Sequence, residues 1–133
     1  MRTPLSPAEA RQSVQITLEG HIPSKKNSYS LGKNGGMFKN KELLAALSSL
    51  EWQAKAQYRA LGRFSPIEYP RSISATFYVA DGRSDLDNKY VALQDVLVSA
   101  GVIVNDSIAR VRRIEAVAIV TSDKRERTEI EIK

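Results

Sequence analysis

The sequence contains no cysteine and a single histidine, His21, among its 133 residues. Without cysteine the chain cannot form a disulfide bond, a thiolate nucleophile or a thiolate metal site. A single histidine excludes histidine-rich metal sites and acid–base catalysis by a pair of histidines. Any metal ion bound by this chain must therefore rest mainly on carboxylate oxygens, which suit magnesium, manganese or calcium.

Long hydrophobic runs are also absent. No apolar stretch approaches the ~20 residues that a membrane-spanning helix needs, and the first residues lack the apolar region of a signal peptide. We therefore expect a cytoplasmic protein without a membrane partner. Hydrophobic residues make up 42% of the chain and charged residues 26%, which is the composition of an ordinary globular protein.

Acidic residues are outnumbered by basic ones, 15 against 20, which gives a formal net charge of +5. Such a surplus favours polyanionic partners such as nucleic acids. It is most pronounced between Gly20 and Lys41, a segment that contains lysines but no acidic residue. Within it, Lys25 and Lys26 either contact phosphate groups or belong to a solvated loop, and the sequence leaves both interpretations open.

Hydrophobic periodicity divides the chain into strands and helices. Alternation of apolar and polar residues predicts strands over residues 13–19, 72–79 and 110–120 and a last strand after Arg127. Apolar spacings of three and four predict one helix between Asn40 and Gly62 and another between Asn88 and Gly101. An Asn-Gly pair within residues 20–40 predicts an irregular, mobile β-hairpin.

This order of elements predicts an α+β fold, in which a mixed β-sheet carries a mobile β-hairpin and two helices packed on one face. Residues 1–12 are expected to form a flexible tail, and residues 13–133 a single domain. Three arginines, Arg110, Arg112 and Arg113, either protect an edge strand from aggregation or extend a basic face.

The most informative segment is Asp85-Leu86-Asp87-Asn88, at the entry to the second predicted helix. In extended backbone, residues two apart point the same way, so Asp85 and Asp87 can present oxygens to one point. Magnesium typically binds one or two carboxylates, with water and phosphate as its other ligands. Asp and Asn are also favoured as helix N-caps, so a purely structural role is the alternative.

A third carboxylate, Asp106, follows the second predicted helix. That helix is about 20 Å long, and the six residues from Gly101 to Asp106 can span about 20 Å in return when extended. We therefore expect Asp106 to lie beside Asp85 and Asp87. Three converging carboxylates repel one another without a cation, so this arrangement favours magnesium-assisted phosphodiester hydrolysis.

The run from Asp85 to Asp106 resembles the RusA family of Holliday-junction resolvases. The similar features are Asp-Leu-Asp-Asn, a helix ending in Ala100-Gly101, and Val104-Asn105-Asp106. The resemblance extends to the first strand with its Pro23-Ser24-Lys25-Lys26-Asn27 loop and to the closing pair of strands. It implies a homodimeric, magnesium-dependent endonuclease, bacterial or phage-encoded, that resolves four-way DNA junctions in recombination and repair. Manganese is a possible substitute, and no organic cofactor is implied.

By the same resemblance, Asp85, Asp87 and Asp106 are the catalytic, metal-binding aspartates. The residues that it places in contact with DNA are Ser24, Lys25, Lys26, Asn27, Arg83, Asn88 and Lys89. One position departs from the family, because Val91 occupies the place of its catalytic lysine, four residues after the second aspartate. Lys89 lies about 200° away around the helix and cannot simply substitute for that lysine. Lys25, Lys26 and Arg83 are candidates for the missing charge.

Two other functions stay open at the level of the sequence. A non-catalytic or weakly catalytic basic dimer would bind branched or single-stranded DNA, with the aspartates as helix caps. A magnesium-dependent hydrolase of nucleotides or phosphomonoesters would need a phosphate-binding loop, and no glycine-rich loop of that kind is present. His21 has no evident catalytic partner in the sequence and is expected to be structural.

Overall fold

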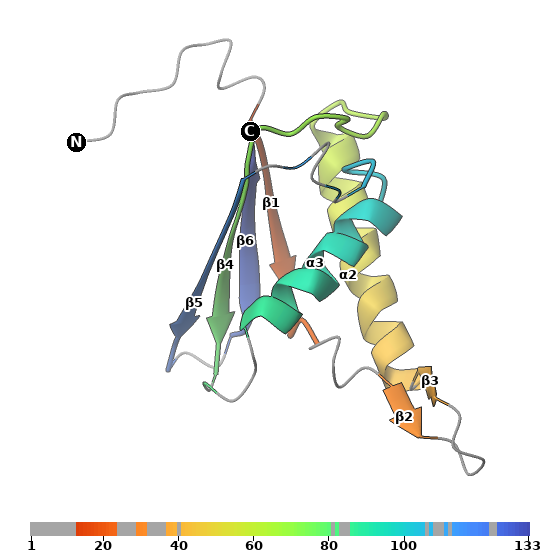
Figure 1. The fold of residues 1–133 in the computed structure, drawn as a ribbon, viewed down its shortest axis with the longest axis vertical. Coiled ribbons are helices and arrows are strands. Elements are labelled where there is room, and N and C mark those ends of the chain that lie inside the picture. The colour runs from red at the N-terminus through yellow and green to blue at the C-terminus, as the bar shows by residue number, and fades with distance from the viewer. Residues whose placement is uncertain are drawn as a thin grey trace.

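The computed structural model describes residues 13–23, 29–31, 37–39, 41–80, 82, 86–105, 107, 111, 113–122 and 125–133. Over this part of the chain the elements follow the order strand, hairpin, helix, strand, helix, strand, strand (Figure 1). The α+β fold class predicted from the sequence is confirmed. The predicted tail, residues 1–12, lies outside the described residues.

The main sheet is mixed, with the strand order β1-β6-β4-β5. Its members are β1 (Val14–Glu19), β4 (Ile73–Val79), β5 (Ile114–Val120) and β6 (Arg127–Ile132). β4 and β5 are parallel, whereas β6 is antiparallel to both β1 and β4. β1, β4 and β5 therefore run in the same direction, and their carboxyl ends meet at one edge of the sheet (Figure 1).

One face of the sheet forms the core. Side chains at alternate positions of β1, β4 and β6 are buried, as a period of two requires. The opposite face carries polar side chains such as Gln15, Thr76 and Glu129, so only one face is apolar across these three strands. The buried residues are Val14, Ile16, Leu18, Ile73, Ala75, Phe77, Val79, Ile130 and Ile132.

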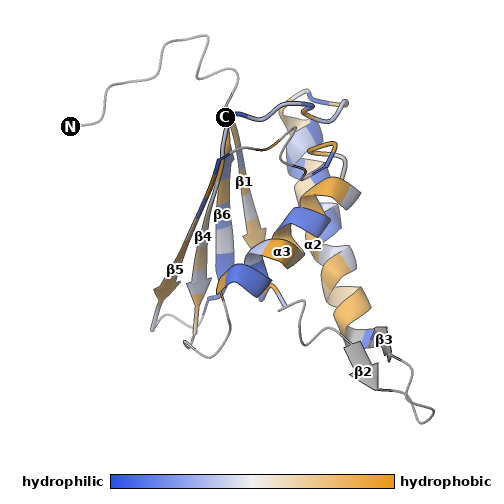
Figure 2. Cartoon of the chain, viewed as in Figure 1, coloured by the Kyte–Doolittle hydropathy of each residue, from blue (hydrophilic) through white to orange (hydrophobic). Residues whose placement is uncertain are grey.

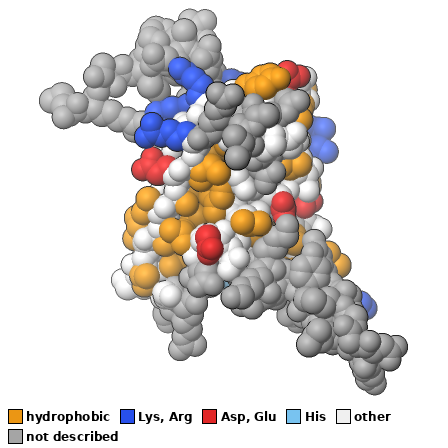
Figure 3. Space-filling model, in the orientation of Figure 1, with side chains coloured by type: hydrophobic (Ala, Val, Ile, Leu, Met, Phe, Trp, Pro, Cys, Tyr) orange, Lys and Arg blue, Asp and Glu red, His pale blue; other side chains and the backbone are white. Residues whose placement is uncertain are grey.

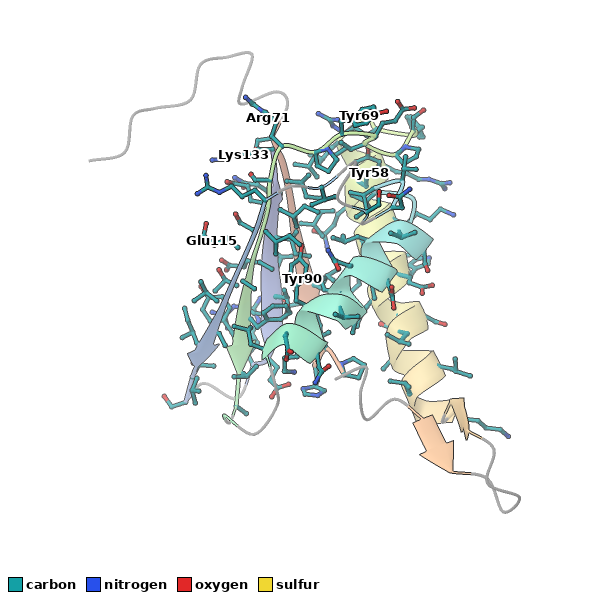
Figure 4. The ribbon with its side chains drawn as sticks, viewed as in Figure 1. Tyr58, Tyr69, Arg71, Tyr90, Glu115 and Lys133 are labelled. Carbon is teal, nitrogen blue, oxygen red and sulfur yellow. The ribbon has the colours of Figure 1, made fainter. Side chains whose placement is uncertain are left out.

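Two helices cover the apolar face, α2 (Lys41–Ala60) and α3 (Leu86–Ser99), as the sequence predicts (Figure 1). Figure 4 shows Tyr90 between α3 and the sheet, where its side chain is 6% exposed. Gly62 and Gly101 follow the two helices with φ of 79° and 77°. This left-handed conformation is one that glycine adopts without a steric penalty, which explains why both helices end there.

A separate antiparallel pair, β2 (Tyr29–Leu31) and β3 (Met37–Lys39), lies near the start of α2 and away from the main sheet (Figure 1). The predicted hairpin is therefore confirmed as a β-pair. The 110–120 strand differs from its prediction, because pairing starts only at Ile114. Val111 is buried and donates its N–H to the Ser107 carbonyl at 2.8 Å, so the chain turns before the ladder begins.

Candidate active site at the carboxyl ends of the strands

The candidate site lies at the sheet edge where β1, β4 and β5 end. The Thr121 N–H donates to the Val79 carbonyl at 2.8 Å, which ties the ends of β5 and β4 together. The first turn of α3 lies at the same edge, because α3 follows β4 after a short connection (Figure 1). In open sheets with parallel strands, ligands usually bind outside the carboxyl ends of the strands. The Asp-Leu-Asp-Asn motif thus occupies a position suited to binding.

Asp87 is exposed in the first turn of α3. Its Oδ1 accepts the Asn88 N–H at 2.9 Å, and a carboxylate there also complements the positive end of the helix dipole. Asn88 is half-buried beside it. Both features agree with a capping role, and the exposed carboxylate is equally able to bind a cation from solvent.

The oxygen donors available at this edge suit magnesium. Asp87 supplies a hard carboxylate oxygen on the surface, and Asp85 precedes it by two residues in the sequence. Among the described residues, no group of three or more His, Asp or Glu side chains is placed to hold a metal ion. The site residues outside the described part of the chain are Ser24, Lys25, Lys26, Asn27, Arg83, Asp85 and Asp106.

Lys89 does not lie where direct contact with DNA requires it. Its side chain is only 3% exposed, and its ammonium donates to the Ile22 carbonyl at 2.7 Å. The predicted DNA contact of Lys89 is therefore wrong for this structure. The physical reason is the helix period, since Lys89 shares the buried side of α3 with Leu93 and Val96.

The chain after α3 stays at the end of the helix rather than returning along it. Val102 donates its N–H to the Leu97 carbonyl at 3.0 Å. Val104 then donates its N–H to the Ile67 carbonyl at 3.2 Å, in the segment that follows α2. These hydrogen bonds hold residues 102–104 against the core, where Val102 and Ile103 are buried. This segment therefore does not extend back along α3 toward its first turn.

The neighbours of Asp106 are therefore remote from Asp87. Ser107 donates its N–H to Asn105 Oδ1 at 3.1 Å, which keeps these two residues together in one turn. A helix of 14 residues such as α3 is about 20 Å long, and the turn lies at its far end (Figure 1). The sequence predicts that this segment lies beside the first turn of α3. Among the described residues of one chain, residues 101–105 and 107 instead stay at the other end of the helix.

Sequence reasoning missed a polar network at the carboxyl edge. Glu126 precedes β6, and its Oε2 lies 2.6 Å from Nδ1 of His21, which follows β1. The other oxygen, Oε1, accepts the Ala80 N–H at 3.0 Å, directly after β4. Glu126 therefore links the ends of β1 and β4 to the start of β6, and it fixes the base of the connection that leads to Asp85.

The ionised form of Glu126 is stabilised by this network. Partial burial opposes ionisation, but the Ala80 N–H, the hydrogen bond with His21 and the nearby charges of His21 and Lys89 outweigh it. The net result is that the pKa of Glu126 lies below its usual value of 4.5. No local pattern indicates this network, because His21 and Glu126 are 105 residues apart in the sequence.

An apolar groove of about 700 Å³ begins beside Asp87 and runs between α3 and β5. Asp87 and Val91 both line it, since residues four apart share one side of a helix. Val91 is 39% exposed. The position where the resemblance places a lysine is therefore on the surface, next to the motif, and filled by an apolar side chain.

Basic side chains of the described residues gather at the other end of the sheet. Arg71 and Lys133 lie there (Figure 4) and line a hollow of about 330 Å³ together with Arg63 and Tyr69. The Arg71 N–H donates to the Lys133 carbonyl at 2.6 Å, so the start of β4 and the end of β6 hold these side chains near one another. Arg125 and Arg127 lie at the opposite edge, where β6 begins and β1 ends, so basic side chains are present at both ends of the sheet.

Comparison with known protein families found no matching family, and comparison with curated proteins found no relative. Neither described helix is both long enough and apolar enough to span a bilayer.

Proposed function

We propose that this protein is a magnesium-dependent endodeoxyribonuclease that acts on four-way DNA junctions in recombination or repair. The observation that carries the proposal is the position of the Asp-Leu-Asp-Asn motif, with Asp87 exposed in the first turn of α3. This turn lies at the carboxyl edge of the parallel strands, where ligands of such sheets bind. The net charge of +5 supports a polyanionic substrate.

In this mechanism Asp85 and Asp87 would be the residues that hold the ion. When bound, the ion would supply Lewis-acid polarisation of the phosphoryl group and a lower pKa for an attacking water. Lys25 and Lys26 contact the DNA backbone and position the strand. Glu126 acts indirectly, because its hydrogen bond to the Ala80 N–H holds the base of the connection that carries Asp85.

Asp106 requires a second copy of the chain if it belongs to the same site. Its neighbours, Asn105 and Ser107, lie at the far end of α3 from Asp87. A junction endonuclease has to cut two equivalent strands, and a two-fold dimer presents two equivalent sites for this purpose. We therefore propose a homodimer in which Asp106 of one copy acts with Asp85 and Asp87 of the other.

The test is binding and nicking of one synthetic four-way junction by the unmodified chain, Asp87→Asn and Asp95→Asn. Asp95 is exposed on the same helix, so it controls for loss of a surface carboxylate. We expect Asp87→Asn to lower magnesium-dependent nicking by about 100-fold or more and to leave junction binding within about three-fold. Nicking by Asp87→Asn at the rate of Asp95→Asn would contradict the site assignment.

A non-catalytic module that binds branched or single-stranded DNA is the second candidate. It is favoured by the contact between Asp87 and the Asn88 N–H, which is a capping interaction, and by Val91 in the place of a basic residue. This candidate predicts junction binding without nicking under magnesium or manganese. Nicking by the unmodified chain that is abolished by EDTA would exclude it.

A further inference from the structure

The outer face of α2 carries the only tryptophan of the sequence, Trp52. The inner face of the helix is the stripe Leu50, Ala54 and Tyr58, which is buried in the core. Trp52 follows Leu50 by two residues, about 200° around the helix, and is 72% exposed. One exposed aromatic side chain is ordinary on a protein surface, so its neighbours decide what it can do.

Trp52 shares its side of α2 with a basic residue. Arg59 follows seven residues later, which is two turns and about 10 Å along the helix axis. Arg59 is exposed, as is Ala56 between the two. Figure 2 shows that the hydrophobic residues of α2 are concentrated in its first turns and that its second half is mainly hydrophilic. The outer face thus combines an aromatic ring with a guanidinium group.

The loop that follows α2 has two more exposed aromatic side chains. Phe64 is 78% exposed, and Tyr69 is 67% exposed. Residues 56–71 contain three arginines but only one acidic residue, Glu68. Figure 4 shows Tyr69 beyond the end of α2 and Arg71 at the adjacent end of the sheet. In Figure 3, hydrophobic and basic side chains appear together at this end of the molecule.

The backbone of this loop is held in place along its length. The Tyr58 hydroxyl donates to the Ser65 carbonyl at 2.6 Å, and the Ile67 N–H donates to the Val102 carbonyl at 2.8 Å. Pro66 and Pro70 restrict the backbone further, because the proline ring fixes φ. The exposed rings are therefore presented on an ordered backbone, which lowers the entropy lost when a ligand binds.

Interleaved aromatic rings and guanidinium groups suit single-stranded nucleic acid. Unpaired bases stack on aromatic side chains, and arginine both pairs with phosphate and stacks on bases. Duplex DNA hides the faces of its bases, so a duplex would leave the rings without a partner. A membrane surface fits less well, because it requires a helix with a continuous apolar face, and the apolar face of α2 is used in the core.

We propose that the exposed face of α2 and the loop after it form a binding surface for single-stranded nucleic acid. Bases stack on the aromatic side chains and phosphates contact the arginines. The residues of this surface are Trp52, Arg59, Phe64, Tyr69 and Arg71.

This surface is separate from the Asp-Leu-Asp-Asn motif. Arg71 precedes β4, whereas the motif follows the other end of that strand, and seven residues of β-strand span about 23 Å. The proposal needs no metal ion and does not rest on nuclease activity.

The fluorescence of Trp52 tests the proposal directly, because the full chain contains no other tryptophan. We expect a short oligothymidine in EDTA to quench this fluorescence in a saturable way, and its duplex with oligoadenine to leave it unchanged. Asp87→Asn should show the same quenching as the unmodified chain. Absence of quenching in a chain that still nicks a four-way junction would overturn this surface and leave the nuclease proposal standing.

Substitution of the ring measures its contribution to affinity. We expect Trp52→Ala to raise the dissociation constant of fluorescein-labelled oligothymidine, measured by anisotropy, about 10-fold, and Trp52→Phe to retain most of the affinity. Val117→Ala is the matched control, because Val117 is an exposed apolar residue of β5, outside this surface. Its dissociation constant should stay within about two-fold of the unmodified value.

The salt dependence of binding tests the phosphate contact. Arg59→Gln should reduce the slope of log affinity against log salt by about 0.7, the value for one phosphate contact on a single strand. Lys41→Gln removes the same charge from the other end of α2 and should leave the slope unchanged. Equal slopes for these two variants, or oligothymidine binding without quenching of Trp52, would overturn the proposal. A shift of Trp52 emission by phosphatidylglycerol vesicles but not by oligothymidine would overturn it in favour of a membrane surface.

Discussion

At the scale of single residues, the chemistry depends on where each carboxylate lies in the fold. The sequence was sufficient to predict a helix directly after the aspartate motif, because the apolar spacing of α3 is regular, but α3 begins at Leu86 rather than Asn88, so Asp87 lies in its first turn. The sequence could not show whether these aspartates cap the helix or bind a metal ion, because both roles use exposed carboxylate oxygens in the first turn of a helix. The hydrogen bond between Asp87 and the Asn88 N–H supports a cap without excluding a cation.

A lysine at position 91 should raise the rate of magnesium-dependent nicking. Val91 is exposed on the same side of α3 as Asp87, so Val91→Lys places an ammonium beside the carboxylate at which the proposed function would bind the scissile phosphate. We expect the rate to rise about 10-fold, since electrostatic stabilisation of the developing charge contributes strongly to phosphoryl transfer. Single-turnover nicking measures this effect. Ser99→Lys, at the exposed far end of the helix, is the control and should change the rate less than about two-fold.

Replacing Glu126 should reveal its contribution to stability as a function of pH. The folded pKa of Glu126 lies below the unfolded value, so its stabilisation is present above about pH 4.5 and is lost as the pH falls through the folded pKa. Glu126→Gln should lower the free energy of unfolding by about 1 kcal/mol at pH 7. Urea unfolding at pH 7 and pH 3 measures the difference between the two proteins. A difference of the same size at both pH values would contradict the charged network.

At the scale of elements, alternation and helical spacing predicted most of the fold. β1, β4 and β6 follow the predicted alternation, and both helices end before the predicted glycines. The start of β5 was predicted too early, because burial of Val111 in a turn depends on tertiary packing that no local pattern encodes. The same limit explains Lys89, whose burial follows from the contact between α3 and the segment after β1.

Lys89 provides a test of that packing. Its ammonium donates to the Ile22 carbonyl inside the protein, so Lys89→Met keeps the apolar stem and removes the hydrogen bond. We expect the free energy of unfolding to fall by about 1–2 kcal/mol, and junction affinity to stay within about two-fold. Urea unfolding and gel-shift titration measure these quantities, with the exposed Lys55→Met as control. Unchanged stability together with a large loss of affinity would restore the predicted contact with DNA.

At the scale of the whole molecule, the path of residues 102–105, which stay at the far end of α3 from Asp87, is the main difference between expectation and structure. Chain length alone allowed residues 101–106 to return to the start of α3. The hydrogen bonds of Val102 and Val104 instead keep this segment at the end of the helix. The number of residues in this segment limits how far it can extend. The burial of apolar residues such as Ile103, which is 1% exposed, determines where the segment lies.

Mixing two inactive variants should therefore restore activity. If Asp106 acts across the dimer, a mixed dimer of Asp87→Asn and Asp106→Asn retains one intact site. A statistical mixture should then regain about a quarter of the unmodified nicking rate, because half of the dimers are mixed and each has one working site. Asp85→Asn mixed with Asp87→Asn is the matched control and should remain inactive. Full activity of Asp106→Asn by itself would remove that residue from the site.

The measurement that tests the central claim most directly is the cleavage of an end-labelled four-way junction by the unmodified chain, with magnesium and with EDTA. Because the proposed dimer carries two equivalent sites, we expect symmetric nicks in two opposing strands, release of linear duplexes with magnesium, and intact junction with EDTA. Tight binding of the junction without a nick in any strand, under magnesium or manganese, would contradict the assignment of a metal-dependent nuclease to this site.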